Sequence, residues 1–171
     1  MNVLDFAIEM ENDGFEYYKD LADSSTLPGL KTIFTSLAAD ELKHAKVFKA
    51  LNTGETVGEM PASETLETSK NLFKQLSGVS EELKNIADSL KAYQHAMKLE
   101  ANSFRFYEEV AEKETNPTVK ALLLQIAEEE HTHFNILENV YSFVNAPNQN
   151  LEWGEFSNLG EFRQFGRETD G

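Results

Sequence analysis

The sequence predicts an all-α protein, a four-helix bundle built from two copies of one helical hairpin. Four long segments place apolar residues at every third or fourth position, which is the period of a helix that packs on one face. No segment shows the sustained alternation of apolar and polar residues that a half-buried strand would require. An internal repeat then sorts the four helical segments into two matching pairs.

The first pair of helices is joined by a short loop. The first helix is predicted over about residues 3–23, and the second begins at Pro28, which suits the first turn of a helix because its missing N–H needs no partner there. The second helix is predicted to end near Leu51. The following segment 52–54, Asn-Thr-Gly, is typical of a helix C-terminus.

The second pair is bounded by similar signals. The third helix ends near Glu114 and begins either at Ser80, a suitable capping residue, or nearer Asp88. The fourth begins at Asn116-Pro117, a capping residue followed by proline, and ends before Pro147. Because the loop inside each pair is short, the two helices of each pair are expected to be antiparallel.

The connection between the pairs is much longer, over about residues 52–87. It is long enough to cross the bundle from end to end, since a helix of about 20 residues spans about 30 Å. A weaker helix is predicted within it, over about residues 63–76, closed by Gly78. We therefore expect one bundle domain over residues 1–147 and a tail over residues 148–171.

An internal repeat relates the two hairpins, which cover about residues 3–51 and 88–144. When the chain is shifted by 89 residues, residues 7–51 align on residues 96–140 without a gap, and eleven of the 45 positions are identical. The protein therefore consists of two copies of one hairpin. The identical pairs are Ala7/Ala96, Glu11/Glu100, Phe15/Phe104, Tyr18/Tyr107, Ala22/Ala111, Thr26/Thr115, Pro28/Pro117, Lys31/Lys120, Ala38/Ala127, Glu41/Glu130 and His44/His133.

Polar residues interrupt the apolar stripe of every long helix near its middle. In the fourth helix, Glu130 and His133 lie within a 3-4-3-4 series of apolar residues that is typical of a helix facing a bundle core. The second helix shows the same arrangement, and the first and third helices each carry one glutamate in the stripe. The sequence thus predicts four glutamates and two histidines in one core: Glu11, Glu41, His44, Glu100, Glu130 and His133.

Four carboxylates in one core need positive charge near them. Burial of an unpaired carboxylate is strongly unfavourable, and no Lys or Arg lies on these stripes. Two divalent ions would balance four negative charges, and the Glu-x-x-His spacing puts both side chains on one helix face, within reach of one ion. One Glu from each of two helices and Glu-x-x-His from each of the other two form the di-metal pattern of helix bundles. These ligands suit iron, manganese and zinc.

Two tyrosines occupy matching positions near the predicted ligands. Tyr18 and Tyr107 follow Glu11 and Glu100 by seven residues and are expected to face the same core. They either contribute aromatic packing or place a phenol that donates a hydrogen bond to a ligand carboxylate or to a bound oxygen species. The second alternative makes Tyr18 and Tyr107 the candidate catalytic residues.

Other polar residues lie beside the predicted ligands. Asp40 and Glu129 directly precede two of the glutamates, and they are either solvated or bonded to the non-metal nitrogen of a histidine ligand. His95 and His131 lie off the central stripe, so we expect ordinary surface or packing roles for them.

The composition restricts the kind of partner. Acidic residues number 30 and basic residues 15, and the net charge of −15 argues against nucleic acid and anionic membranes, which attract basic surfaces. The chain has no Cys, which excludes disulfides, thiolate metal sites and a thiol nucleophile. Residues 1–5 do not resemble the start of a secretory signal, and no apolar run reaches the ~18 residues of a membrane helix. We therefore expect a soluble cytoplasmic protein.

The motif segments resemble those of a known family. Residues 38–45, Ala-Ala-Asp-Glu-Leu-Lys-His-Ala, residues 126–134, Ile-Ala-Glu-Glu-Glu-His-Thr-His-Phe, and the two Glu-x6-Tyr helices are similar to the rubrerythrin branch of the ferritin-like superfamily, over about residues 3–144. The resemblance implies an up-down-down-up bundle in which the six predicted ligands hold two iron ions. It also implies chemistry on hydrogen peroxide or dioxygen, protection against oxidative stress, and a homodimer.

Two features differ from the family pattern. Typical rubrerythrins carry a second domain whose iron is held by four cysteines and supplies electrons, whereas this chain has no Cys and resembles relatives that lack the rubredoxin domain. Many also have a further Glu one turn after the third-helix ligand, where this chain has Ser103, and the repeat mate of Ser103 is Gly14. A separate electron donor is then required, and the metal centre is expected to be more symmetric.

Three functions are compatible with these residues. The first is a di-iron oxidoreductase that reduces hydrogen peroxide or dioxygen. The second is ferroxidation and iron handling, as in ferritin-like relatives, and it would use the same six ligands. The third is a non-enzymatic bundle in which a tightly held metal serves as a structural staple.

The tail carries a series of large apolar residues among glycines and polar residues. We expect it either to cover an open part of the bundle or to contact a second subunit or an electron donor. The residues recur every three positions and are Trp153, Phe156, Leu159, Phe162 and Phe165.

Overall fold

The computed structural model describes residues 2–75 and 89–145, and within these ranges every regular element is a helix. The chain divides into two compact units, Met1–Thr65 and Leu66–Gly171, each of which contains one long helical hairpin. The predicted all-α class is therefore confirmed. The helices are α1 (Val3–Ser24), α2 (Pro28–Asn52), α3 (Thr65–Gln75), α5 (Leu90–Lys113) and α6 (Pro117–Asn145).

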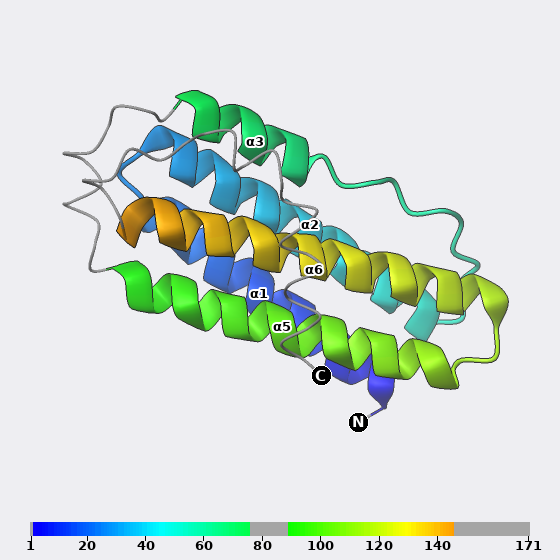
Figure 1. Ribbon diagram of the computed structural model, residues 1–171. Coiled ribbons are helices and arrows are strands. Elements are labelled where there is room, and N and C mark those ends of the chain that lie inside the picture. The colour runs from blue at the N-terminus through cyan, green and yellow to red at the C-terminus, as the bar shows by residue number, and fades with distance from the viewer. Residues whose placement is uncertain (1, 76–88, 146–171) are drawn as a thin grey trace. The chain divides into compact units, whose positions relative to one another are not determined.

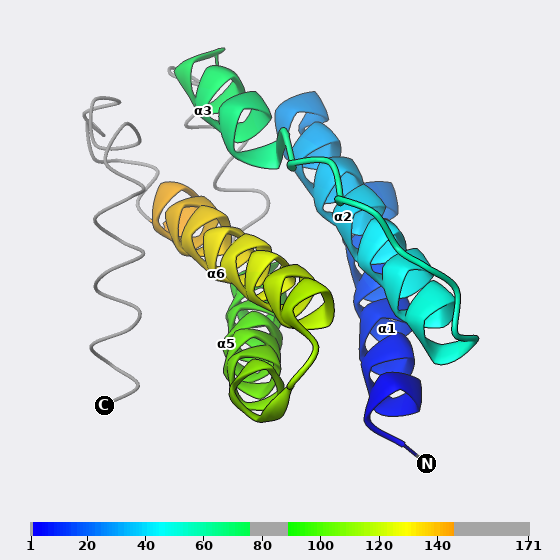
Figure 2. The ribbon, with the colours of Figure 1, turned by 90° about the vertical axis from the view of Figure 1, so that its right-hand side faces the viewer.

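In the first unit, α1 and α2 lie side by side as an antiparallel hairpin (Figures 1 and 2). The N-terminus of α1 is closed by a capping box, in which the Asp5 N–H donates to Asn2 Oδ1 at 2.8 Å and the Asn2 N–H donates to Asp5 Oδ2 at 3.3 Å. The Asn52 amide donates to Asp5 Oδ1 at 2.8 Å. The start of α1 is thereby held against the end of α2.

The end of α2 has the geometry that the Asn-Thr-Gly segment predicts. Gly54 has φ +79°, a left-handed conformation that favours glycine. The Gly54 N–H donates to the Leu51 carbonyl at 3.2 Å and the Glu55 N–H donates to the Ala50 carbonyl at 3.0 Å. This pair of bonds is a Schellman motif, which satisfies carbonyls that the last turn leaves without helical partners.

In the second unit, α5 and α6 form the matching hairpin (Figures 1 and 2). Asn116 caps α6 as predicted, because its Oδ1 accepts from the Thr118 N–H at 3.0 Å and the Val119 N–H at 3.3 Å. At the other end of the hairpin, the Gln94 amide donates to the Tyr141 hydroxyl at 3.2 Å. This last hydrogen bond joins α5 to α6.

The weaker helix predicted in the connection is also present, as α3. It packs against α6 through Phe73 and Phe143, whose ring centroids are 5.8 Å apart. The observed helices begin and end within two residues of most predicted bounds, and α5 begins at Leu90. Ser80, Asp88 and Gly78, and the whole aromatic tail from residue 148, lie outside the described residues.

None of the helices in the described ranges is long and apolar enough to cross a membrane.

Candidate metal centre

The predicted polar stripes are buried in all four long helices. Glu11 and Glu100 lie on the buried faces of α1 and α5, and the two Glu-x-x-His pairs lie on those of α2 and α6. Most of the apolar members of the stripes are buried with them. The exceptions are half-buried and lie on α1, at the end of α2 and on α5: Leu4, Ile8, Phe15, Leu51 and Met97.

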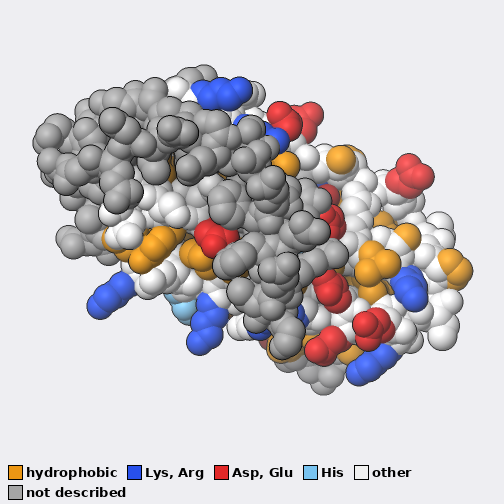
Figure 3. Space-filling model, viewed as in Figure 1, with side chains coloured by type: hydrophobic (Ala, Val, Ile, Leu, Met, Phe, Trp, Pro, Cys, Tyr) orange, Lys and Arg blue, Asp and Glu red, His pale blue; other side chains and the backbone are white. Residues whose placement is uncertain are grey.

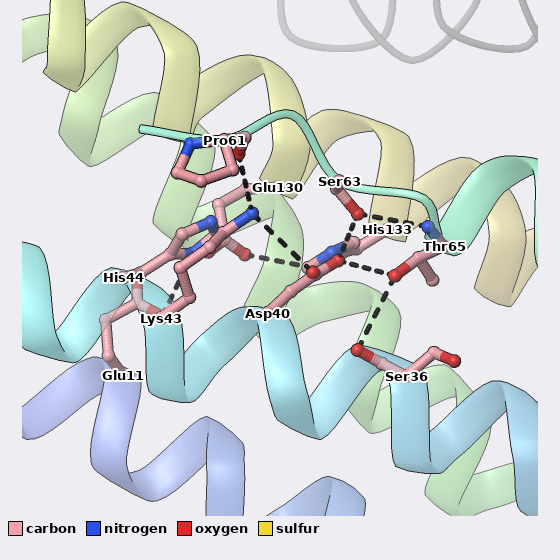
Figure 4. A network of polar contacts seen from close by, with 10 residues as sticks. All are labelled: Glu11, Ser36, Asp40, Lys43, His44, Pro61, Ser63, Thr65, Glu130 and His133. Carbon is pink, nitrogen blue, oxygen red and sulfur yellow. Dashed lines mark hydrogen bonds and ion pairs between the residues drawn. The ribbon is translucent and has the colours of Figure 1, made fainter. Parts of the chain in front are cut away.

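The first hairpin brings three of the predicted ligands together. Glu11 comes from α1, and Glu41 and His44 come from α2, one helical turn apart. One potential ligand atom from each residue lies within 4.8 Å of the others, and His44 Nδ1 is 3.4 Å from Glu11 Oε2 (Figure 4). The side chains of His44 and Glu11 are only 0% and 1% exposed. We call these three residues the first triad.

The second hairpin repeats this arrangement. Glu100 comes from α5, and Glu130 and His133 come from α6, with one potential ligand atom from each within 4.8 Å of the others. His133 Nδ1 is 3.4 Å from Glu100 Oε1 and 3.7 Å from Glu130 Oε2. We call these residues the second triad. The sequence repeat is therefore also a repeat of side-chain geometry.

The spacing within each triad fits ligands of a shared ion. Two ligand atoms that are each about 2.1 Å from one ion lie about 3.0 to 3.4 Å apart when the bonds meet at about 90 to 109°. The Nδ1 to oxygen distance in each His-Glu pair between helices is 3.4 Å, at the wide end of this range. It is longer than an ordinary N–H···O hydrogen bond, which is about 2.9 Å. The donor set, imidazole nitrogen and carboxylate oxygen, suits iron, manganese or zinc.

The Glu100 carboxylate of the second triad has a raised affinity for protons. Burial, and then the charge of the neighbouring Glu130, raise the pKa of Glu100 well above its ordinary value of 4.5, and His133 opposes this rise. A buried carboxylate that resists ionisation beside another carboxylate is the electrostatic situation that a bound cation relieves.

No lysine or arginine in the described ranges is buried, so none compensates the triads from within the core. Charged side chains of both signs are instead visible on the outer surface (Figure 3). The positive charge that these carboxylates need has to come from a bound cation, a proton or a histidine. This result agrees with the charge argument made from the sequence.

Gly14 provides space for one of the predicted ligands. A Cβ atom added at Gly14 of α1 would lie 2.7 Å from Glu41 Oε2 and 3.3 Å from Glu41 Cδ, and its three nearest neighbours are all atoms of Glu41. Only glycine leaves room for the carboxylate in this position. The repeat relates Gly14 to Ser103, but this contact is not predictable from the sequence pattern.

The candidate catalytic tyrosines are buried as predicted. Tyr18 lies on α1 and Tyr107 on α5, each two turns beyond the glutamate of its own helix. Each ring packs edge-on against the preceding aromatic residue, with centroids 6.2 Å apart for Tyr17 and Tyr18 and 5.5 Å apart for Phe106 and Tyr107. Aromatic packing therefore holds for both residues, and a catalytic role stays a prediction.

Asp40 has a role that the sequence analysis missed. Its Oδ2 accepts hydrogen bonds from the hydroxyls of Ser63 at 2.6 Å and Thr65 at 2.7 Å (Figure 4). Its Oδ1 is 3.8 Å from Lys43 Nζ, which also donates a hydrogen bond to the Pro61 carbonyl at 3.1 Å. Asp40 thus holds the connection against α2 beside Glu41. The sequence feature that could have indicated this contact is the pair of hydroxyl residues, Ser63 and Thr65, at the start of the predicted weak helix.

The remaining neighbours of the ligands are also buried. Asp40 and Glu129 have buried side chains, so the alternative of simple solvation is wrong for both. His131 is fully buried and packs on Phe104, with ring centroids 4.6 Å apart, which confirms a packing role. His95 is exposed, as expected for a surface residue.

A family comparison agrees with this geometry. No curated protein and no solved structure matches the chain. The family model described as Rubrerythrin matches residues 2–141, which include both hairpins and both triads. The match covers most of the chain and bears out the resemblance of the motif segments and the ferritin-like fold class. The chain therefore belongs to the rubrerythrin family.

Proposed function

We propose that the two triads hold two iron ions and that the protein is a di-iron oxidoreductase acting on hydrogen peroxide or dioxygen. One observation carries the proposal: each hairpin collects two glutamates and one histidine in a buried cluster, and the two clusters match residue for residue. Four carboxylates and two imidazoles suffice for two divalent ions. Family membership supports iron as the metal, while manganese and zinc would accept the same ligands.

The residues of the chain have separate tasks in this proposal. Bound iron would supply electrons and Lewis acidity toward the oxidant. The four glutamates balance the charge of the ions, and the buried positions of both triads exclude bulk water. The Tyr18 and Tyr107 hydroxyls are proposed to donate hydrogen bonds, either to a ligand carboxylate or to the oxidant.

The electron supply, assembly and location follow as further parts of the proposal. The chain has no cysteine and so no thiolate-bound iron of its own, and we propose that a separate protein supplies electrons. We also propose a homodimer, a cytoplasmic location and a role against oxidative stress, on the grounds of family membership.

Stopped-flow spectroscopy tests the enzyme directly. The anaerobic protein, loaded with two ferrous ions per chain, is mixed with peroxide or with dioxygen, and the absorption of the ferric protein is followed. We expect oxidation much faster than that of free ferrous ion at the same pH. Glu100→Ala, which removes one ligand, is the matched control and should lose most of this acceleration. Oxidation of the wild-type protein at the rate of free ferrous ion would disprove the oxidoreductase.

A second candidate is iron handling, in which the protein oxidises and sequesters iron. One observation favours this function. Many rubrerythrins have a further glutamate one turn after the third-helix ligand, whereas this chain has Ser103 there and Gly14 at the matching position of the first repeat. Assembly separates the two functions. Light scattering that shows a shell of 12 or 24 subunits, of the kind ferritins form, would favour iron storage, whereas a dimer would favour the redox enzyme. Tightly bound zinc without turnover would indicate a structural staple.

A further inference from the structure

The first triad depends on a glycine that is not a ligand. Gly14 lies on α1, one turn after Glu11, and faces α2 at Glu41. Oε2 of Glu41 is 2.7 Å from the position that a Cβ at residue 14 would take, closer than two such atoms can approach. The Glu41 carboxylate therefore lies in a slot on α1 that exists only because residue 14 has no side chain.

The second hairpin has no such slot. Its residue equivalent to Gly14 is Ser103, which carries a Cβ and a hydroxyl and is half-buried on α5. Glu130, the repeat mate of Glu41, thus faces a helix surface of a different shape. The two triads contain the same ligand types, but the backbone surface against which the α2 and α6 glutamates lie differs between them.

Glycine inside a helix needs a reason, because it costs helix stability relative to alanine. Gly14 lies in the middle of the 22 residues of α1 and does not serve as a cap or a turn. The three atoms nearest to its absent Cβ belong to one side chain, that of Glu41. The nearest neighbours of Gly14 therefore indicate that its steric role is to leave space for this carboxylate.

We propose that Gly14 is a positioning residue that sets the orientation of the Glu41 carboxylate and thereby the metal affinity of the first triad. The inference rests on the proposed metal centre and deepens it. A methyl group at residue 14 displaces the carboxylate from its slot. Without metal the displaced side chain rotates to another conformation at little cost, but with metal it no longer meets the ion at the geometry set by Glu11 and His44.

Titration with cobalt(II), followed by calorimetry and visible absorption, tests the proposal without any assay of activity. The variants are Gly14→Ala and, as the matched control from the other repeat, Ser103→Ala, which adds no atom. We expect Gly14→Ala to weaken cobalt binding at one of two sites by about tenfold or more, the scale on which residues that orient ligands act. We expect Ser103→Ala to bind within about twofold of the wild type.

Thermal melting of the metal-free proteins shows whether Gly14→Ala merely damages the fold. The variant should melt at or above the temperature of the wild type, because alanine favours the helix. A double-mutant cycle with Glu41→Asp then tests whether Gly14 acts through Glu41. The shorter aspartate does not enter the slot, so Gly14→Ala should have little further effect on cobalt affinity in that background.

The outcomes separate the two proposals. Wild-type protein that binds no cobalt would disprove the metal centre and this inference with it. Wild-type protein that binds two cobalt ions, together with a Gly14→Ala variant of unchanged affinity, would disprove the positioning role alone. The positioning role would also be disproved if Gly14→Ala lowered cobalt affinity equally in the wild-type and in the Glu41→Asp background. The effect of residue 14 would then not depend on the glutamate.

Discussion

His133 Nδ1 lies 3.4 Å from Glu100 Oε1, and these atoms join the two helices of the second hairpin in its core. The equivalent atoms of His44 and Glu11 are also 3.4 Å apart in the first hairpin. The same nitrogen of each histidine thus faces the carboxylate of the neighbouring helix, as expected if both are ligands of one ion. A protonated histidine beside a carboxylate is the other arrangement that this distance permits, and the two differ in how they respond to substitution.

Removal of either inter-helix glutamate distinguishes these arrangements. We expect Glu11→Ala and Glu100→Ala each to lower the metal content of the purified protein from about two ions per chain to one or fewer. Neither should lower the melting temperature of the metal-free protein, because the substitution removes the repulsion between that glutamate and the other glutamate of its triad. Elemental analysis and thermal melting measure the two effects. A fall of several degrees in the metal-free Glu11→Ala variant would indicate that Glu11 is instead held by a protein partner such as His44.

The Asp40 contacts predict a different result, a loss of stability with metal binding intact. Asp40→Ala removes the acceptor of the Ser63 and Thr65 hydroxyls. Hydrogen bonds to a charged group contribute about 1.5–3 kcal/mol each, so we expect a loss of about 2 kcal/mol or more in the free energy of unfolding. Urea denaturation measures it.

Two further observations complete the Asp40 test. The control variant is Thr35→Ala, because Thr35 is exposed on the same helix and its hydroxyl donates to the Lys31 carbonyl. This variant should change the free energy of unfolding by less than about 0.5 kcal/mol. Cobalt affinity should be unchanged in Asp40→Ala, since Asp40 is bound to the connection. An Asp40→Ala variant of wild-type stability would contradict the role assigned to these hydrogen bonds.

The sequence was sufficient to predict the helices and the six candidate ligands, for local reasons. Pro28, Asn116 and Gly54 act within one helical turn, so their effects on helix ends can be read without knowledge of the fold. The candidate ligands were recognisable because a glutamate in an apolar stripe conflicts with the helical pattern, and the repeat showed the same conflict twice.

The contacts that sequence reasoning missed are those that depend on distant partners or on side-chain conformation. Asp40 bonds to Ser63 and Thr65, 23 and 25 residues away, in a segment where helical periodicity is weak. The Glu41 carboxylate occupies the slot at Gly14 because Glu41 adopts one of several possible conformations, and the sequence specifies the residue type but not that conformation. Contacts of this kind are determined by the three-dimensional fold.

The tyrosines give a kinetic prediction. Tyr18→Phe and Tyr107→Phe keep the buried ring and remove only the hydroxyl. If the hydroxyls assist the oxidant, each variant should bind two ferrous ions normally and show oxidation slowed by about tenfold, the size expected for loss of one hydrogen bond of about 1.4 kcal/mol in the transition state. Tyr93→Phe on α5 serves as the control, because the Tyr93 side chain is buried but hydrogen-bonded to Ser89 at the start of the helix. Unchanged rates for both variants would leave only the packing role.

The last prediction concerns the opposite effects of pH on the metal-free and metal-loaded proteins. Because the pKa of Glu100 is raised in the folded metal-free protein, this carboxyl binds more protons there than in the unfolded chain between about pH 4.5 and the raised pKa. Its free energy of unfolding should therefore fall as the pH rises from about 5 toward 8. In the loaded protein, protons compete with the metal for the histidines and glutamates, so stability should instead fall toward acid.

Metal binds the folded form alone and should add about 4 kcal/mol to the free energy of unfolding at a free concentration a thousand times the dissociation constant. Melting temperatures measured across this pH range, with and without ferrous ion under argon, test both slopes. Parallel curves would contradict a buried metal centre, because surface carboxylates would give metal no such influence on folding.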